Sequence, residues 1–324
     1  MSQPWPTWVL LLAPQLWSAD GGVQRYGRSL LEAMQQVRPS AQVQVLALLD
    51  QPGRWQRLSF LLAALLTVRQ RPQLVLCTHL HLAPLGWLVA RLSGGQLWVS
   101  LHGIEAWRPL RGLRRWALLH SNLLLPVSRY TAELVQQQLG PPMPPWTLLP
   151  NTYDAERFRP GPRSEALLVR YGLSPEQSLF FALTRLSVGD RHKHLDRVIA
   201  AMAEVRRSHP QAMLLIAGDG DDRPRLQQLG HQLDLEDAVL LPGRLSEDEL
   251  ADHYRLATAF VLPSEKEGFG IVFLEALGCG RPVLAGNRDG SLDPLGDGRF
   301  GLLVDPHLPL APALASLLAR QGED

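Results

Sequence analysis

Short apolar runs alternate with amphipathic stretches along this chain, and that alternation constrains its fold more than any other feature. Apolar runs bounded by turn-forming residues predict buried strands, and the amphipathic stretches between them predict helices. This order is typical of βα units packed around a parallel sheet. Strands are predicted at Trp8 to Ala13, Val43 to Leu49, Leu74 to Cys77, Leu97 to Ser100, Leu123 to Val127, Leu179 to Leu183, Met213 to Ala217, Val239 to Leu241, Ala259 to Leu262 and Val283 to Ala285. The sequence therefore predicts an α/β protein with doubly wound parallel sheets.

A proline-rich segment divides this pattern into two halves. Seven of the 23 residues from Gly140 to Pro162 are proline, and proline stops helices because it lacks an N–H group. We therefore expect an N-terminal domain at residues 1–150, a linker at 151–162 and a C-terminal domain at 163–324. Ligands of doubly wound sheets bind beyond the carboxyl ends of the strands, so the residues that follow each strand are the candidates for a site.

The two halves carry opposite net charge. Residues 1–160 hold 15 basic and 7 acidic side chains, whereas residues 161–324 hold 17 basic and 24 acidic ones. Surfaces this different predict different partners. The segment from Trp107 to Trp116 has four arginines and no acidic residue. Such a surface suits an anionic membrane, although a solvated helix with buried tryptophans explains it equally well. We expect no nucleic-acid partner.

Cysteine content and the length of the apolar runs indicate the compartment. The two cysteines, Cys77 and Cys279, lie far apart in apolar stretches, so neither a disulfide framework nor a cysteine zinc site is expected. The apolar run from Leu58 to Val68 is 11 residues long, short of the roughly 20 needed to span a bilayer, and it predicts a buried helix. We expect a cytoplasmic protein, peripheral on the inner face of the membrane if the basic domain docks there.

Two cations flank the loop that follows the strand at Leu179 to Leu183. Arg185 lies at the start of this loop, and Lys193 lies where the next helix is expected to begin. A planar guanidinium and a compact ammonium suit the oxygens of a diphosphate. Lys193 is one of two lysines among 32 basic residues, the other being Lys266. Solvated loop charges are the plain alternative.

Two glutamates and a glycine follow the strand at Ala259 to Leu262. Glu267 and Glu275 are eight residues apart, about two helical turns, so both face one side if a helix begins between them. Phe269 and Gly270 stand at the expected helix start, where backbone N–H groups attract anions and hydroxyl groups. Carboxylates accept hydrogen bonds from sugar hydroxyls, so this element predicts a polyol site beside a phosphate site.

The first domain offers weaker signals. Gly21 and Gly22 open the helix after the first strand, where backbone N–H groups can approach an anion closely. His102 ends another strand and is a candidate hydrogen-bond donor or acid/base group. His79 and His81 alternate along a third strand end, but no third metal ligand is evident near them in the sequence. We therefore predict no metal site there.

These pieces together resemble a known family. Glu267 and Glu275 lie within Glu-Gly-Phe-Gly-Ile-Val-Phe-Leu-Glu-Ala, after the loop that holds Arg185 and Lys193. This arrangement resembles the retaining nucleotide-sugar glycosyltransferases of family 4 (glycosyl transferases group 1). Other segments match the family in the same order and cover nearly the whole chain: Gly21-Gly22, His102-Gly103, Pro126-Val127-Ser128, Pro150-Asn151, Ala217 to Gly220 and Gly301 to Pro306. The resemblance implies the GT-B fold, in which two Rossmann-like doubly wound domains face each other across a cleft.

The resemblance also implies an activity and a role for each matching residue. It implies a hexosyltransferase that moves a sugar from a nucleotide-diphosphate donor to a hydroxyl of a glycan, lipid-linked or small-molecule acceptor, with retention of configuration. No cofactor and no metal are implied. By similarity, Arg185 and Lys193 hold the donor diphosphate and stabilise the leaving group, and Glu267 with the Phe269 and Gly270 amides binds the sugar. Glu275 accepts from the ribose hydroxyls, Leu245 lies in the segment that lines the base, Gly21 and Gly22 approach the diphosphate, and His102 reaches the donor sugar.

Two alternatives stay open. Asp219 and Asp221 form an Asp-x-Asp pair, the signature of a metal-dependent glycosyltransferase, and a protein that binds sugar nucleotides without turning them over keeps the same binding residues. A dinucleotide-binding oxidoreductase is disfavoured because no Gly-x-Gly-x-x-Gly follows the first strand. The family has glycine directly after the clamp lysine, where this chain has His194. The geometry of the loop at that position therefore stays open.

Overall fold

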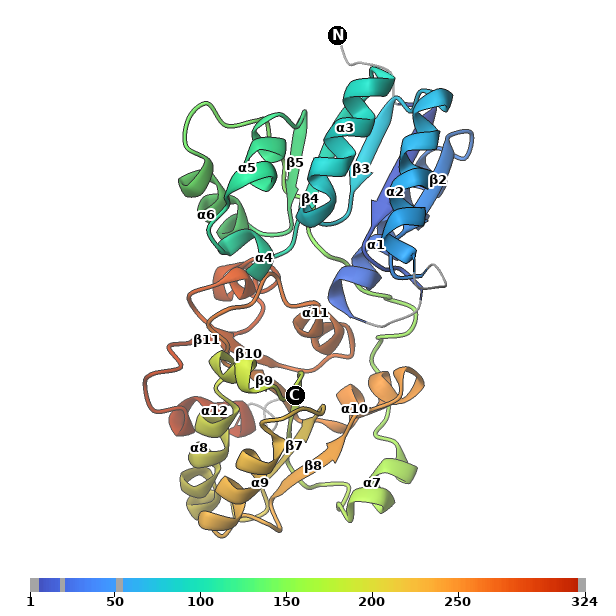
Figure 1. The fold of residues 1–324 in the computed structure, drawn as a ribbon. Coiled ribbons are helices and arrows are strands. Elements are labelled where there is room, and N and C mark those ends of the chain that lie inside the picture. The colour runs from blue at the N-terminus through green and yellow to red at the C-terminus, as the bar shows by residue number, and fades with distance from the viewer. Residues whose placement is uncertain (1–5, 18–20, 51–54, 320–324) are drawn as a thin grey trace. The chain divides into compact units, whose positions relative to one another are not determined.

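The computed structural model describes residues 6–17, 21–50 and 55–319 of the chain. The chain divides into two compact units, Met1–Thr152 and Tyr153–Asp324, each built on one parallel sheet (Figure 1). This confirms the predicted α/β architecture with two doubly wound parallel sheets. Residues 153–162, expected in a linker, belong to the second unit, and Phe158 is buried in that unit's core.

The first unit contains a five-stranded sheet in the order β2-β1-β3-β4-β5. All neighbouring strands pair in parallel. The strands are β1 (Trp8–Ala13), β2 (Gln42–Ala47), β3 (Leu74–Cys77), β4 (Gln96–Leu101) and β5 (Leu123–Pro126). The helices are α1 (Gly22–Val37), α2 (Gln56–Leu66), α3 (Ala83–Ser93), α4 (Ile104–Trp107), α5 (Gly112–Leu119) and α6 (Arg129–Leu139), with short 3-10 turns η1 (Thr67–Gln70) and η2 (Leu80–Leu82).

Strand β1 shows that this sheet is buried on both faces. Leu10 and Leu12 pack into one buried cluster, whereas Val9 and Leu11 pack into another. The two sets differ because successive side chains of a strand point to opposite faces of the sheet. A strand covered on both faces has no polar side, which is why a continuous apolar run predicts it correctly.

The apolar run from Leu58 to Val68 forms helix α2 and turn η1, but the prediction that this helix is buried is wrong. Phe60 and Ala64 pack into the core of the first unit. Leu58 and Leu66, in contrast, are 48% and 59% exposed. The exposed leucines Leu58, Leu61, Leu62 and Leu66 share one side of the helix, whereas Phe60 and Ala64 lie on another side, which faces the core. None of the helices in the described part of the chain is long and apolar enough to cross a membrane.

The second unit contains a six-stranded parallel sheet in the order β11-β10-β9-β6-β7-β8. Its strands are β6 (Leu179–Leu183), β7 (Met213–Ala217), β8 (Val239–Gly243), β9 (Ala259–Leu262), β10 (Val283–Gly286) and β11 (Leu302–Val304). Its helices are α7 (Glu165–Tyr171), α8 (Leu195–Ser208), α9 (Arg223–Gln232), α10 (Leu250–Leu256), α11 (Ile271–Gly278) and α12 (Ala311–Ala319). Short 3-10 turns are η3 (Val188–Lys193), η4 (Glu247–Glu249), η5 (Gly290–Leu292) and η6 (Gly296–Gly298).

The strand order of the second unit reverses between β6 and β9. From β6 the chain proceeds to β7 and β8 on one side, and then crosses to β9, β10 and β11 on the other. Ligands of open α/β sheets bind at such a switch point, beyond the carboxyl ends of the two strands that flank it. The loops after β6 and β9 are therefore the place to look for a site.

Candidate functional site

Lys193 and Glu267 meet at the switch point of the second sheet. Lys193 ends turn η3 after β6, and Glu267 lies in the loop after β9. Their ammonium and carboxylate groups form an ion pair, with side chains 12% and 21% exposed. A second contact ties the same loops together, because the Glu265 amide donates to the His192 carbonyl at 3.0 Å. The structure thus brings together two residues that the sequence placed 74 positions apart.

Arg185 lines the same small pocket as Lys193. Its guanidinium, however, is bound within its own loop. Nε donates to Asp190 Oδ2 at 2.6 Å, and Nη2 donates to Oδ1 at 3.2 Å. The Asp190 side chain is 9% exposed and the Arg185 side chain is 73% exposed. The cation that sequence reasoning expected to point at an anion is therefore paired with a carboxylate that it did not single out.

Asp289, in the loop after β10, holds the Glu267 loop in place and was not among the predicted site residues. Its carboxylate accepts from the Glu267 amide at 2.5 Å, the Ser291 amide at 2.9 Å and the Ser264 hydroxyl at 3.0 Å. Burial raises the pKa of this fully buried carboxyl, against the effect of its hydrogen bonds. Its position just after the tenth strand was the signal that could have identified it.

Gly290 adds a backbone contact to the same loop. Its amide donates to the Glu267 carbonyl at 2.9 Å. A Cβ atom at this position would lie 2.2 Å from the Gly268 carbonyl oxygen. Only glycine therefore allows the two loops to approach this closely. Together, Asp289 and Gly290 bind both the amide and the carbonyl of Glu267.

Phe269 and Gly270 lie directly before helix α11, at the helix start that the sequence predicts. Gly270 precedes the first helical residue with φ +88°, and a Cβ there would lie 2.4 Å from the ring of Phe273. Glycine is favoured here for two reasons: side chains are strained at this positive φ, and a Cβ would clash with the Phe273 ring. The Phe269 side chain is buried, so its backbone is the part that can serve a ligand.

Glu275 lies in the second turn of α11 and is 1% exposed. Its Oε2 accepts from the hydroxyl of Tyr254 at 2.7 Å, and Tyr254 is itself fully buried. Glu267, by contrast, lies before the helix and is partly exposed. The expected arrangement holds, with one glutamate on the helix and one preceding it, but Glu275 also has a partner inside the core.

The remaining predicted positions of the second unit lie on neighbouring strand ends. Leu245 follows β8 and packs partly buried against the core. The Asp221 carboxylate accepts a hydrogen bond from the Val188 amide at 2.7 Å. Oδ1 of Asp219 lies 3.7 Å from Nη1 of Arg223, as an ion pair. The two carboxylates of the Asp-x-Asp pair are thus engaged with different groups.

His102 in the first unit is a buried, neutral imidazole. Its Nε2 lies 2.7 Å from the Thr78 carbonyl, and because a carbonyl only accepts, Nε2 carries the proton. Burial lowers the pKa of His102, and its ring packs edge-on against Tyr26. Burial also lowers the pKa of His79 to about 4. His79 and His81 contact each other, with Nδ1 of His79 accepting from the His81 amide at 3.2 Å.

Gly21 and Gly22 stand at the start of α1. Gly21 precedes the helix in an extended conformation, and its carbonyl accepts from the Arg25 amide at 2.9 Å. Ala19 and Asp20, which directly precede Gly21 in the sequence, lie outside the described residues. The helix start itself is where the sequence placed it.

Two family models match this chain. The model described as Glycosyl transferases group 1 matches residues 171–323, and the model described as Glycosyltransferase Family 4 matches residues 20–157. The chain belongs to glycosyltransferase family 4. Both site loops of the second unit, with Lys193 and Glu267, lie inside the first of these matches.

This family 4 chain is similar to curated bacterial proteins. It is 36% identical over 202 residues to a GDP-mannose-dependent alpha-(1-6)-phosphatidylinositol monomannoside mannosyltransferase of Mycobacterium tuberculosis, and the match covers 59% of this chain and 51% of that protein. A D-inositol 3-phosphate glycosyltransferase of Acidothermus cellulolyticus is 33% identical over 182 residues, and the match covers 53% of this chain and 40% of that protein. The chain spans about half the length of the curated relatives it matches.

Solved structures share the fold of this family 4 chain. The HepE protein of Anabaena in complex with UDP has a TM-score of 0.74 and 19% identity, covering 98% of this chain and 90% of that one. A sucrose-phosphate synthase of Thermosynechococcus elongatus has a TM-score of 0.76 and 21% identity, with the same coverage. These similarities confirm the predicted GT-B fold.

Proposed function

We propose that this protein transfers a hexose from a nucleoside diphosphate donor to a hydroxyl group of an acceptor, with retention of configuration. The observation that carries the proposal is the Lys193–Glu267 pair at the switch point, with Asp289 bound to the Glu267 backbone. Such a transfer needs a cation for the departing diphosphate beside an acceptor of hydrogen bonds for the sugar hydroxyls. This pair supplies both groups.

Lys193 acts on the leaving group. Negative charge grows on the diphosphate as its bond to the sugar breaks, and a cation placed there in advance stabilises that charge. Losing one such contact costs about a hundredfold or more in rate. Arg185 is the second cation in this proposal, since it lines the same pocket, and it exchanges Asp190 for the diphosphate when the donor binds.

The sugar and the ribose have separate partners in the proposal. Glu267 and the amides of Phe269 and Gly270 bind the sugar, while Glu275 accepts from the ribose. Because Glu275 is 1% exposed, ribose binding requires a local rearrangement around its carboxylate. Leu245 contacts the base.

The proposed chemistry needs no metal ion. The cations of Lys193 and Arg185 supply the charge that a bound metal supplies in metal-dependent enzymes. The engagement of Asp221 with the Val188 amide supports this assignment. The roles of Gly21, Gly22 and His102 stay predictions from the family resemblance.

The donor and acceptor are proposed from the relatives. The mycobacterial relative is named for GDP-mannose and a phosphatidylinositol monomannoside, and the Anabaena structure contains UDP. We propose a GDP- or UDP-hexose donor and a lipid-linked acceptor. Exposed Arg108, Arg111 and Arg114 in the first unit, together with Leu113 at 71% exposure, support contact with an anionic membrane. Cosedimentation that does not depend on anionic lipid would contradict that contact.

A donor-hydrolysis assay tests the function without knowledge of the acceptor, because water serves as the acceptor. We expect release of nucleoside diphosphate from a matching donor, with turnover at saturating donor unchanged in EDTA. Lys193→Ala should lower that turnover by about a hundredfold. Lys266→Ala is the matched control, because Lys266 is exposed in the loop that carries Glu267, and it should keep wild-type turnover.

Three outcomes contradict parts of this proposal. Turnover of Lys193→Ala close to that of Lys266→Ala removes the role of Lys193. Strict dependence on Mg²⁺ or Mn²⁺ favours Asp219 and Asp221 as metal ligands. Donor binding without any turnover identifies a sugar-nucleotide-binding protein instead of an enzyme.

A further inference from the structure

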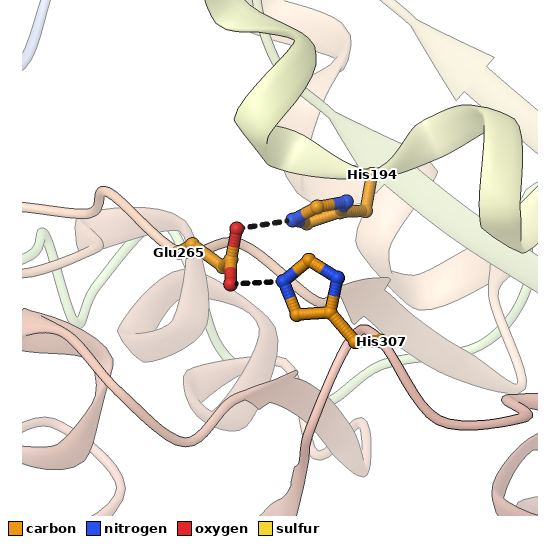
Figure 2. Close-up of side chains that lie close together, drawn as sticks. All are labelled: His194, Glu265 and His307. Carbon is orange, nitrogen blue, oxygen red and sulfur yellow. Dashed lines mark hydrogen bonds and ion pairs between the residues drawn. The ribbon is translucent and has the colours of Figure 1, made fainter.

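Two histidines and a glutamate from three separate loops converge beside the proposed donor site (Figure 2). His194 follows turn η3, Glu265 lies in the loop after β9, and His307 lies between β11 and α12. Nε2 of His194 is 2.9 Å from Glu265 Oε2, and Nε2 of His307 is 2.5 Å from Glu265 Oε1. One carboxylate therefore joins two imidazoles, and none of the three side chains has a part in the proposed transfer.

The backbone of His194 is in a conformation that favours glycine. Its φ and ψ are 56° and 32°, in the left-handed region. A residue with a Cβ loses about 1–2 kcal/mol there. His194 thus adopts a backbone conformation typical of glycine, the residue that the family resemblance implies at this position. Strain kept at one residue points to a use for its side chain, and here that side chain reaches Glu265.

His307 is held in position by its neighbours. Its amide donates to Asp305 Oδ1 at 3.0 Å, and its carbonyl accepts from Arg197 Nη2 at 2.9 Å. These contacts fix the turn that presents the imidazole. The three side chains are 12%, 24% and 53% exposed in the order His194, Glu265, His307. The cluster is therefore prearranged and still open to solvent on the His307 side.

The chemistry of these three groups matches one class of ion. The three ligand atoms lie within 4.8 Å of one another. Two imidazoles and a carboxylate form a ligand set that zinc uses at sites with an open fourth position. Magnesium prefers oxygen ligands and disfavours imidazole. Zinc would bind the Nε2 lone pairs, so the proton of each imidazole moves to Nδ1 and Glu265 turns from hydrogen-bond acceptor to ligand.

We propose that His194, Glu265 and His307 form a zinc-binding site that ties three loops of the second unit together. Its place in the chain gives it a regulatory role, because His194 follows Lys193 directly and Glu265 lies two residues before Glu267. Bound zinc stiffens both loops and so increases the affinity for the donor. This coupling rests on the proposed function, whereas zinc binding itself does not.

Zinc titration of the full chain without a polyhistidine tag tests the site. We expect one equivalent of Zn²⁺ per chain by calorimetry, a rise in Tm with zinc, and no rise with the same concentration of Mg²⁺. His194→Gly and His307→Ala should each weaken zinc binding by about tenfold or more. Mutation of a residue that merely supports a metal ligand already lowers metal affinity by about that factor. Glycine suits the left-handed backbone at position 194, so lost binding in His194→Gly does not come from misfolding.

His231→Ala is the matched control. His231 also pairs with a glutamate, Glu236, but both side chains are half-exposed or more, and no third ligand of the described residues joins them. Zinc binding should be unchanged in this variant. Absence of stoichiometric binding, wild-type binding in His194→Gly and His307→Ala, or an equal loss in His231→Ala would each overturn the site.

Donor affinity with and without zinc tests the coupling. We expect zinc to tighten donor binding at least about fivefold in the wild type and not in His307→Ala, within the usual range of coupling between sites. Unchanged or weaker donor binding overturns the regulatory role. Zinc binding without any donor binding contradicts the proposed function instead, so the two failures are distinguishable.

Discussion

Asp289→Ala should both destabilise the second unit and impair Glu267, because the same buried carboxylate pairs three donors and holds the backbone of Glu267 in place. The side chain is fully buried and accepts hydrogen bonds from the Glu267 amide, the Ser291 amide and the Ser264 hydroxyl. Alanine leaves all three donors without this acceptor. Asparagine keeps one carbonyl oxygen but places an NH₂ group against a donor.

The magnitude follows from these contacts. A buried donor left unpaired costs about 1–3 kcal/mol, so three of them cost roughly 3–9 kcal/mol before relaxation. Removing the charge recovers part of this, since burial raises the pKa of Asp289 and so penalises its ionised form. We expect a loss of about 4 kcal/mol for Asp289→Ala and about 2 kcal/mol for the neutral, similarly shaped Asp289→Asn.

Urea denaturation and donor-hydrolysis kinetics measure the two effects separately. Asp289→Asn should remain folded and show a turnover reduced by about tenfold, because Glu267 loses its backbone support. Ser264→Ala, which removes one of the three donors, should lose about 1 kcal/mol and little turnover. The reasoning is refuted if Asp289→Asn is as stable as the wild type, or if it is destabilised with unchanged kinetics.

Two further predictions separate structural from functional roles in the second unit. Tyr254→Phe removes the hydrogen bond to Glu275 and should lower stability by about 2 kcal/mol with little change in donor affinity. Glu275→Gln should lower both stability and donor affinity. If Tyr254→Phe and Glu275→Gln bind the donor equally well, Glu275 has no role in ribose binding. Hydrogen bonds from Arg225, then from Arg191, hold the pKa of Asp222 below its usual range, so its stabilisation is present above the unfolded-state pKa of about 4 and is lost as pH falls below it. Asp222→Asn should therefore cost about 2 kcal/mol at pH 7 in urea denaturation, and a cost that stays constant to pH 3 would contradict this.

Strands buried on both faces were the most predictable part of the fold. The runs at β1, β3, β6, β7 and β9 match the structure residue for residue. Such strands contain only apolar side chains and stand out from their surroundings. Strand β11 was not predicted, because its three residues are only partly buried. The burial of α2 was wrong because an apolar run does not reveal which of its sides meets the sheet.

The site residues in the loops that directly follow a strand were predictable from the sequence. The rule that ligands bind beyond strand ends located Arg185, Lys193 and Glu267 before any geometry was known. The same rule extends to Asp289 after β10, but the sequence does not show that its carboxylate contacts the Glu267 loop. It also did not reveal the pairing of Arg185 with Asp190, since local sequence does not specify which of several charges a guanidinium meets. The sequence marks His194 as a departure from the family, but Glu265 is 71 residues away and His307 a further 42, so only the structure shows that the three converge.

A thermal-shift panel of UDP-, GDP- and ADP-hexoses tests the central claim most directly, because that claim is donor binding at the Lys193–Glu267 pair. At a concentration of about 100 Kd, a matching donor should stabilise the protein by about 2.7 kcal/mol, on the order of 5–10 °C in Tm for a unit of this size. The account predicts this shift in the wild type and in Lys266→Ala, and its loss in Lys193→Ala. No shift with any donor, or an equal shift in Lys193→Ala, would contradict it.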